Sequence, residues 1–164
     1  KKFVVFDLET TGLTPTADMI IEIGAVKIEN GRMTETFSTL VNPQRPIPQK
    51  NVELTGISDS DVKDSPLIKD VLPDFYKFCD GCTLVGQNSD AFDVPFLKVA
   101  AERLNIYFEN DQLDVMILAQ KYFPHLKRFN LAVLSKYFDV VNEAAHRAVS
   151  ETTAKIFIKI AEKM

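Results

Sequence analysis

The first quarter of the chain alternates between apolar runs and turn residues in a way that predicts three strands. Residues 3–8 form an apolar run typical of a strand that is buried on both faces. An isoleucine-rich run covers residues 19–28, and Asn30-Gly31 is a two-residue turn signal after which residues 32–41 return. We therefore expect an antiparallel three-strand meander at the start of the chain.

Beyond residue 42, the pattern predicts helices that alternate with short strands. Prolines predict an extended loop over residues 42–50, and a Ser-Asp-Ser run at residues 58–60 offers helix N-caps. Helices are expected at 67–79, 90–104, 113–123, 130–137 and 144–163, and short strands at 83–86 and 111–114. This order predicts an α/β fold, a five-stranded mixed sheet with the antiparallel meander, two parallel strands and helices on both faces.

Composition limits the class of protein. The 164 residues suit one domain, 46% are hydrophobic, and no apolar run approaches the ~20 residues that span a bilayer. We see no signal peptide and expect a cytoplasmic protein without a membrane partner. The chain starts Lys1-Lys2, so we expect a single domain, residues 1–164, taken from a larger polypeptide.

The net charge of −4 argues against a protein that grips nucleic acid by neutralising its backbone alone. This charge is still compatible with an enzyme that binds phosphate groups through metal cations.

Cys79 and Cys82 are the two cysteines, in a C-x-x-C spacing that is found in zinc sites and redox pairs. No second pair accompanies them, and both adjoin apolar runs. We interpret them as reduced, partly buried thiols, because free cysteine behaves as a small hydrophobe.

Asp7 and Glu9 directly follow the apolar part of the first strand. Residues two apart in a strand point the same way, with Cα atoms ~6.6 Å apart. Two carboxylates so placed can hold divalent metal, but D-x-E at a strand end is a weak signal by itself, and the simpler interpretation is a pair of solvated turn residues. Haloacid-dehalogenase-type phosphatases also begin with a strand that ends in D-x-D, but the second acid here is Glu9.

Two later stretches carry further candidate groups. Asp93 lies in the early turns of the helix expected at 90–104; Asp90 already serves the dipole of that helix, which leaves Asp93 for another role. Phe92 can stack on a base or pack in the core. His146 precedes Glu151 by five residues, and Glu151 can alternatively pair with Lys155 on the surface of a helix.

Together, the three stretches resemble the DnaQ-like 3′–5′ exonucleases of the DEDDh type, and most closely the proofreading domain of a PolC-type bacterial DNA polymerase III. The family motifs occur in order as DLETTG from Asp7 to Gly12, as Asn88 with Phe92-Asp93, and as His146 with Glu151. The segment ELTGIS at 53–58 and the helical region 113–138 also resemble the family. The resemblance spans essentially the whole chain.

The resemblance implies a ribonuclease H-like fold and removal of 3′-terminal nucleotides from DNA as 5′-monophosphates. It implies two Mg²⁺ or Mn²⁺ ions, held by Asp7, Glu9, Asp93 and Glu151, with His146 as general base. It also implies a single-stranded 3′ end of DNA (or RNA) as substrate and the polymerase portion of the parent chain as partner. The implied pocket for the terminal nucleotide is lined by Thr10, Thr11, Gly12, Leu13, Leu54, Asn88 and Phe92.

Two departures from the family pattern leave an alternative open. Gln87 stands where the family usually has histidine, and Glu151 stands where the last ligand is normally aspartate. Magnesium demands near-ideal octahedral geometry, and glutamate adds one methylene. The alternative is therefore a weakened or non-catalytic nucleic-acid-binding module of the same fold.

His125 is the rival candidate for the base. It lies in FPHLKR, a basic segment at residues 123–128 that either contacts backbone phosphates or covers a helix end.

Overall fold

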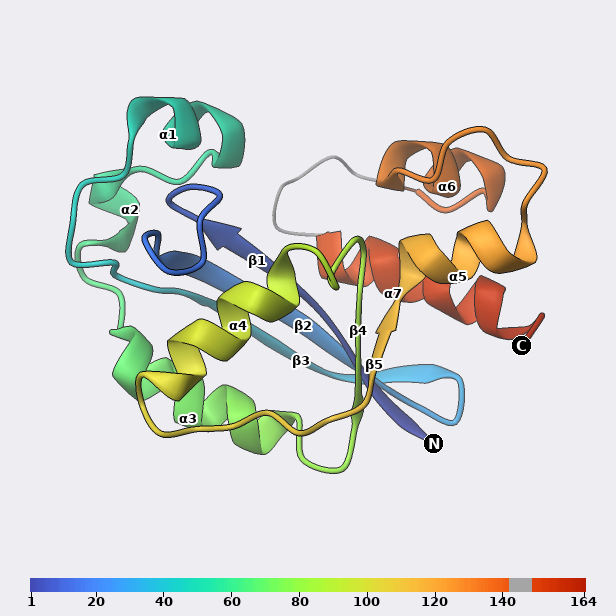
Figure 1. Ribbon diagram of the computed structural model, residues 1–164, viewed down its shortest axis with the longest axis horizontal. Helices are drawn as coiled ribbons and strands as arrows, with labels where there is room; N and C mark the ends of the chain where they lie inside the picture. The colour runs from blue at the N-terminus through green and yellow to red at the C-terminus, as the bar shows by residue number, and fades with distance from the viewer. Residues whose placement is uncertain (142–148) are drawn as a thin grey trace.

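The computed structural model describes residues 1–141 and 149–164. Its centre is one five-stranded sheet with the strand order β3-β2-β1-β4-β5 (Figure 1). The strands are β1 (Lys2–Thr10), β2 (Ile20–Glu29), β3 (Arg32–Leu40), β4 (Thr83–Gly86) and β5 (Gln112–Asp114). The first three pair antiparallel, whereas β4 pairs parallel with β1 and β5 pairs parallel with β4. The predicted mixed sheet is confirmed.

The β2–β3 hairpin follows from its turn residues. Asn30 and Gly31 both have positive φ, 53° and 76°, the conformation that a two-residue hairpin turn of this type requires.

Helices occupy both faces of the sheet. They are α1 (Gln49–Thr55), α2 (Asp59–Val62), α3 (Ile68–Phe78), α4 (Asp93–Glu102), α5 (Val115–Tyr122), α6 (Leu131–Tyr137) and α7 (Val149–Ala161). The α2 helix begins at Asp59, and its N-cap is Ser58, one of the three predicted cap residues, which forms a capping box with Asp61. The α1 helix was not predicted; it lies within and beyond the segment expected to be an extended loop.

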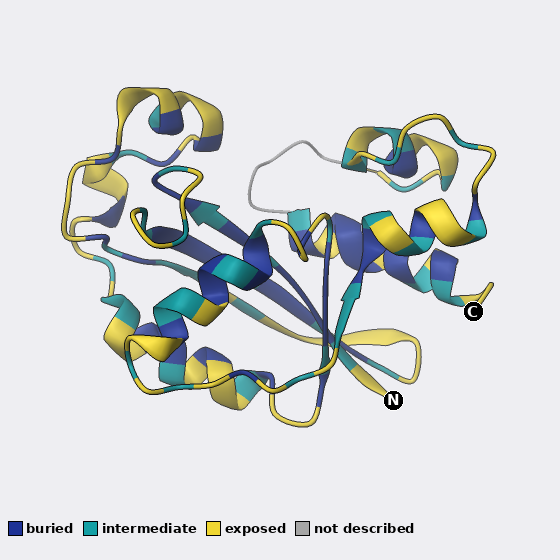
Figure 2. Cartoon of the chain, in the orientation of Figure 1, coloured by how far each residue is buried: buried dark blue, intermediate teal, exposed yellow. Residues whose placement is uncertain are grey.

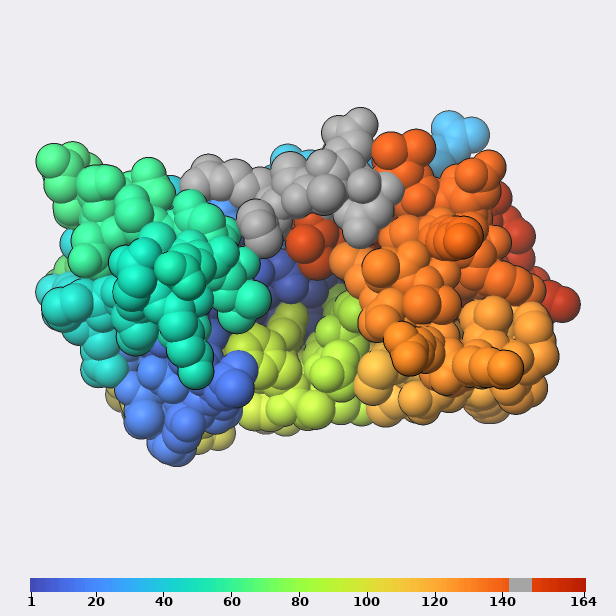
Figure 3. Space-filling model, turned by 90° about the horizontal axis from the view of Figure 1, so that it is seen from above, coloured from blue at the N-terminus to red at the C-terminus, as the bar shows by residue number. Residues whose placement is uncertain are grey.

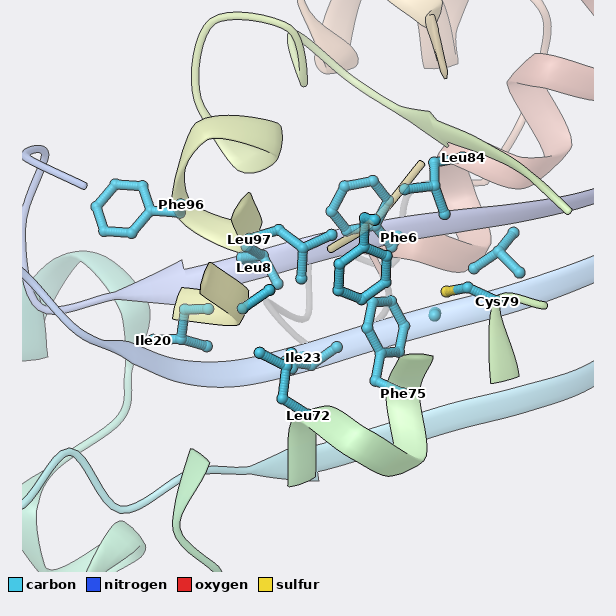
Figure 4. Packing of buried hydrophobic residues seen from close by; sticks show 14 of the residues in the cluster. Phe6, Leu8, Ile20, Ile23, Leu72, Phe75, Cys79, Leu84, Phe96 and Leu97 are labelled. Atoms are coloured by element: carbon cyan, nitrogen blue, oxygen red, sulfur yellow. The ribbon is translucent and has the colours of Figure 1, made fainter. Parts of the chain in front are cut away.

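The sheet separates two apolar clusters. Val4, Phe6 and Leu8 of β1 face α3 and α4 (Figure 4), while Val5 faces α5 and α7. The central strands β1, β2 and β4 are consequently buried on both faces (Figure 2). Because side chains alternate along β1, Asp7 and Glu9 project on the side of Val5, where that apolar cluster ends.

Strand direction determines where functional groups can meet. Because β1, β4 and β5 run parallel, their carboxyl ends lie at one edge of the sheet. Asp7 and Glu9 near the end of β1, the loop after β4 and Asp114 at the end of β5 therefore share this edge. In the described part of the chain, no helix is both long and apolar enough to cross a membrane.

Candidate active site

Asp7 and Glu9 have very different cross-strand neighbours on β2. Asp7 pairs with Gly24 of β2, and Glu9 pairs with Glu22. Gly24 has no side chain beside Asp7, and a Cβ there would be in ordinary contact, at 3.5 Å, with the hydroxyl of Ser150 in the first turn of α7. The start of α7 thus lies against the sheet beside Asp7.

Asp93 is the first residue of α4, three residues later than the expected start of this helix. The assignment of Asp90 to the helix N-terminus is therefore wrong: Asp90 lies in the preceding turn, and Asp93 itself is the acid of the first turn. The backbone N–H of Val94 donates to the carbonyl of Ser89, which closes this turn. Asp93 is only 4% exposed.

The tight turn after β4 also depends on Gly86. A Cβ at this position would approach Cβ of Ser89 to 2.6 Å. Glycine therefore allows the loop to fold back and bring Asp93 towards the end of β1.

The three carboxyl groups are electrostatically coupled. Burial raises the pKa of Asp7 well above its usual value, and the charges of Asp93 and Glu9 raise it further. Burial is also the main reason that the pKa of Asp93 rises to about 8, although a hydrogen bond with the backbone of Leu8 acts in the opposite direction. The pKa of Glu9 rises to about 7, again mainly through burial. These groups lie close enough to oppose one another's ionisation.

Glu22 is a further acid at this site that the sequence analysis did not select. It is buried and lies directly across from Glu9 on β2, and its charge raises the pKa of both Glu9 and Asp7. Its position within the isoleucine-rich run of β2 was the available signal, because an acid inside a buried strand needs a reason to be there.

Asp114 anchors the loop that carries the middle motif. Its carboxylate accepts hydrogen bonds from the backbone N–H groups of Asn88 at 2.9 Å, Asp90 at 3.1 Å and Met116 at 2.9 Å. The bond to Met116 caps α5, while the other two hold the β4–α4 loop. Asp114 is 4% exposed, so this buried carboxylate holds in place the loop that leads to Asp93.

These elements enclose a cleft of about 440 Å³ that opens between the α1 side and the α5–α6 side of the molecule (Figure 3). Its described lining comprises Asp7, Leu8, Glu9, Thr10, Gly12, Leu13, Asn51, Leu54, Thr55, Gln87, Asn88, Phe92 and Asp93. The cleft therefore brings together three predicted acids and six of the seven residues predicted for the nucleotide pocket. The other four lining residues, Leu8, Asn51, Thr55 and Gln87, were not predicted for the site, and Asn51 and Thr55 come from the unpredicted helix α1.

Thr11 is the exception among the predicted pocket residues. It is 2% exposed; its hydroxyl donates to Asp18 and accepts the backbone N–H of Met19 at 2.9 Å. Thr11 closes the turn rather than lining the cleft. Glycine suits position 12, because a Cβ there would clash with the carboxylate of Asp18 and force that side chain to move.

Two exposed leucines stand at the cleft. Leu13, in the turn after β1, is 74% exposed, and Leu54 of α1 is 65% exposed. Both line the cleft together with Phe92. Apolar side chains held in water beside buried acids favour a ligand that has both a flat apolar face and a charged group.

The last motif is only partly described. His146 lies outside the described residues. Glu151 occupies the first turn of α7, is exposed, and is absent from the described lining of the cleft. His125, the rival base, also lies outside that lining; its ring nitrogen is hydrogen-bonded to the hydroxyl of Tyr137 at 3.2 Å.

The donor set of the cleft suits hard divalent cations. Carboxylate oxygens are the ligands that Mg²⁺ and Mn²⁺ take in proteins, and positive charge would offset the mutual repulsion of Asp7, Glu9 and Asp93. Within residues 1–141 and 149–164, no three acidic, histidine or cysteine side chains form a ready-made metal site. The chemistry of the lining therefore fits metal, although the described acids, Glu151 included, are not gathered into a complete set of ligands.

Cys79 and Cys82 lie in the α3–β4 connection, away from the cleft lining. Both are buried and unlinked, which confirms the interpretation as buried thiols. Burial raises the pKa of Cys79 to about 12 and also raises the pKa of Cys82. Neither thiol is disposed to form a reactive thiolate.

A mixed sheet of this order, with carboxylates gathered where β1 and β4 end, defines a ribonuclease H-like protein of the nuclease class. The chain matches the family model for exonucleases (RNase_T) over residues 4–157. It belongs to this family, the DnaQ-like exonucleases that its motifs resemble. This assignment excludes the haloacid-dehalogenase-type phosphatase.

Relatives with similar sequences are DNA polymerase III proteins. The chain is 48% identical over 165 residues to the PolC-type DNA polymerase III of Caldanaerobacter subterraneus, covering 99% of this chain and 12% of that protein. It is 38% identical over 165 residues to the DNA polymerase III subunit epsilon of Aquifex aeolicus, covering 99% of this chain and 81% of that subunit. The chain therefore spans about an eighth of its PolC-type relative.

Solved structures share the fold. Exonuclease X in complex with 5′ overhanging duplex DNA aligns with a TM-score of 0.79 at 26% identity, over 98% of this chain and 91% of that one. E. coli exonuclease I in complex with a dT13 oligonucleotide aligns with a TM-score of 0.86 at 16% identity, over 99% and 41%.

Proposed function

We propose that this chain is a metal-dependent 3′–5′ exonuclease domain that removes 3′-terminal nucleotides from DNA as 5′-monophosphates. The observation that carries the proposal is the convergence of Asp7, Glu9 and Asp93, distant in sequence, on one cleft as coupled carboxyl groups. Membership of the exonuclease family supports hydrolysis at a nucleic-acid end. Proofreading during replication, in the cytoplasm, is proposed from the DNA polymerase III relatives.

Asp7, Glu9, Asp93 and Glu151 would hold two Mg²⁺ or Mn²⁺ ions. When bound, these ions would offset the negative charge of the cleft and stabilise the charge that develops on the phosphodiester oxygens during in-line displacement. The raised pKa values of Glu9 and Asp93 support this assignment, because both groups lack a cation among the described residues that stabilises their charged form.

The remaining cleft residues would position the terminal nucleotide. Leu13, Leu54 and Phe92 offer apolar surfaces to its base and sugar, and Asn88 and Gly12 bring polar backbone and side-chain groups close to it. Such contacts read a stacking face and a strand end rather than base identity. A mismatched end frays more readily from its duplex, so selectivity for errors would come from the substrate.

His146 would act as the general base. An imidazole with an unperturbed pKa of ~6.5 can take a proton from the attacking water near neutral pH. The resulting hydroxide would attack the terminal phosphodiester and break the bond between phosphorus and the 3′ oxygen of the preceding nucleotide, which releases a nucleoside 5′-monophosphate and leaves a new 3′ hydroxyl end. The polymerase portion of a parent chain would supply the frayed 3′ end.

Incubation with 5′-labelled single-stranded DNA and Mg²⁺ or Mn²⁺ tests the proposal. We expect a ladder of products shortened from the 3′ end, with an RNA of the same sequence run in parallel to compare the two sugars. Asp93→Asn should abolish the ladder, whereas Asp90→Asn, which neutralises an exposed acid of the same loop, should retain it. Full-length DNA with both metals would reject the proposed activity.

The second candidate is a weakened or non-catalytic nucleic-acid-binding module, and the exposure of Glu151 outside the described cleft lining favours it. Two substitutions separate the candidates. Loss of existing cleavage in Glu151→Gln identifies glutamate as a working ligand. Appearance of cleavage only in Glu151→Asp identifies a site weakened by the longer side chain.

A further inference from the structure

Charge is divided very unevenly along this acidic chain. Residues 1–114 contain 11 Lys and Arg against 19 Asp and Glu, a net charge of −8. Residues 115–164 contain 8 against 4, a net charge of +4. The described residues of this second part, 115–141 and 149–164, contain 7 against 3 and carry the same +4. The whole-chain charge of −4 thus conceals a basic C-terminal part.

The basic part flanks the cleft. It comprises α5, α6 and α7, and the first two of these helices lie across the hollow from α1 (Figure 3). The side-chain amide of Gln87, which lines the cleft, donates a 2.8 Å hydrogen bond to the carbonyl of Phe129. This bond joins the cleft lining to the α5–α6 connection across 42 positions of sequence. Lys127 and Arg128 immediately precede Phe129, so their backbone lies next to the residue that is bonded to the cleft lining.

The α5–α6 connection holds these two cations in a defined place. Phe123 is buried at its start and packs edge-on against Phe138, with ring centroids 5.0 Å apart. At its end, Asn130 caps α6 by accepting the backbone N–H of Val133. Fixed at both ends and at Phe129, the connection can present charge to a ligand with little loss of conformational entropy.

Lys127 and Arg128 are available to a ligand. Both are exposed, and neither forms an ion pair with any residue that the structure describes. Lys121, in the last turn of α5, adds a third cation next to the connection. Exposed cations without acidic partners are the groups that neutralise phosphates, and arginine suits phosphate by its bidentate geometry.

We propose that Lys127 and Arg128 form a second subsite that holds the phosphate backbone of the nucleic-acid strand leading to the cleft. The inference rests on the proposed function, since it takes the cleft to hold the strand's 3′ end. The acidic remainder of the protein repels the phosphate backbone of the strand. The strand is therefore steered along the α5–α6 side of the molecule rather than across α1. The alternative role of the segment 123–128 is to cover a helix end. That role does not require a charge at Lys127 or Arg128, which are both exposed.

Affinity for fluorescent single-stranded DNA, measured by anisotropy in EDTA, tests the subsite independently of cleavage. The variant is Lys127→Gln/Arg128→Gln. The matched control is Lys69→Gln/Lys77→Gln, which removes two exposed cations from α3 on the opposite side of the sheet. A 12-mer reaches beyond the cleft, whereas a trimer of the same 3′ sequence fills only the cleft. Thermal unfolding of each variant verifies the fold.

For the 12-mer, each lost phosphate contact should lower the slope of log affinity against log salt by ~0.7, or ~1.4 in total. Between 50 and 200 mM salt, the native protein should therefore lose ~7-fold more affinity than the variant. The control should keep the native slope, and the variant should lose less affinity for the trimer than for the 12-mer.

Equal slopes of log affinity against log salt for the variant and the native protein would overturn the inference. Lys127 and Arg128 would then be assigned to binding an acidic protein partner instead. Equal losses with trimer and 12-mer would also overturn it, because the effect would then lie in the cleft. Since no metal is present, failure of the exonuclease proposal would leave these binding results interpretable.

Discussion

Asp93→Asn should make the metal-free protein more stable at neutral pH, even though it removes a proposed metal ligand. The carboxyl group is 4% exposed, and burial is the main cause that raises its pKa from 3.8 to about 8. An amide has the same shape, is neutral at every pH and keeps an oxygen that can accept a hydrogen bond. The substitution therefore removes the cost of ionising a buried group without creating a cavity.

The size and sign of the effect follow from proton linkage. Below pH 3.8 the group is protonated in both the folded and the unfolded state. Between pH 3.8 and about 8 the folded state keeps a proton that the unfolded state releases, so the free energy of unfolding falls as pH rises. One pKa unit corresponds to ~1.4 kcal/mol, so from pH 5 to pH 7.5 this group destabilises the native protein by at most ~3 kcal/mol.

Urea denaturation in EDTA, followed by circular dichroism at pH 5.0 and pH 7.5, measures the effect. The stability gained by Asp93→Asn should grow between the two pH values by up to ~3 kcal/mol. Asp90→Asn should stay within ~0.5 kcal/mol of the native protein, because Asp90 is exposed. A saturating excess of Mg²⁺, ~100-fold over its Kd, should stabilise the native protein by ~2.7 kcal/mol.

An Asp93→Asn protein that is no more stable than the native one at pH 7.5, or a stability difference that is the same at both pH values, would contradict this prediction. Either result would mean that the carboxylate is already compensated in the metal-free protein.

Three further predictions concern the framework of the cleft. Asp114→Ala leaves three backbone N–H groups without their acceptor and should cost ~3 kcal/mol in urea denaturation, with Asp114→Asn losing less because one acceptor oxygen remains. Gly12→Ala forces a Cβ against Asp18 and should cost ~1–3 kcal/mol and lower kcat/KM for 3′ trimming; an unchanged kcat/KM would argue against a role for this turn. Leu54→Ala should raise KM several-fold with stability within ~0.5 kcal/mol, while the exposed Met33→Ala on β3 should change neither quantity; equal KM values would exclude Leu54 from the substrate pocket.

The sheet could be predicted because its signals are local. Apolar runs and the Asn30-Gly31 turn define β1, β2 and β3, and the structure confirms each within two residues. The α1 helix was missed because its seven residues follow a proline-rich loop and contain Asn51 and Thr55, whose burial depends on the rest of the fold.

The acids of the site could be predicted only in part, for a related reason. Asp7, Glu9 and Asp93 lie at the ends of elements, where an apolar run in the sequence is interrupted, so the sequence alone identifies them as candidates. Glu22 is hidden within an apolar strand, and Asp114 looks like an ordinary cap until its three backbone partners are known. Which acids face one another is decided by strand register, and sequence spacing does not contain that information.

The proposed function requires divalent cations to occupy the cleft that Asp7, Glu9 and Asp93 share. A crystal structure of the protein soaked in Mn²⁺, with data collected at the manganese absorption edge, measures this directly. We expect two anomalous peaks in the cleft, ~3.5–4 Å apart, with Asp7 bound to both and Glu151 bound to one of them. A cleft without manganese at saturating concentration, or manganese bound only at other surface acids, would contradict it.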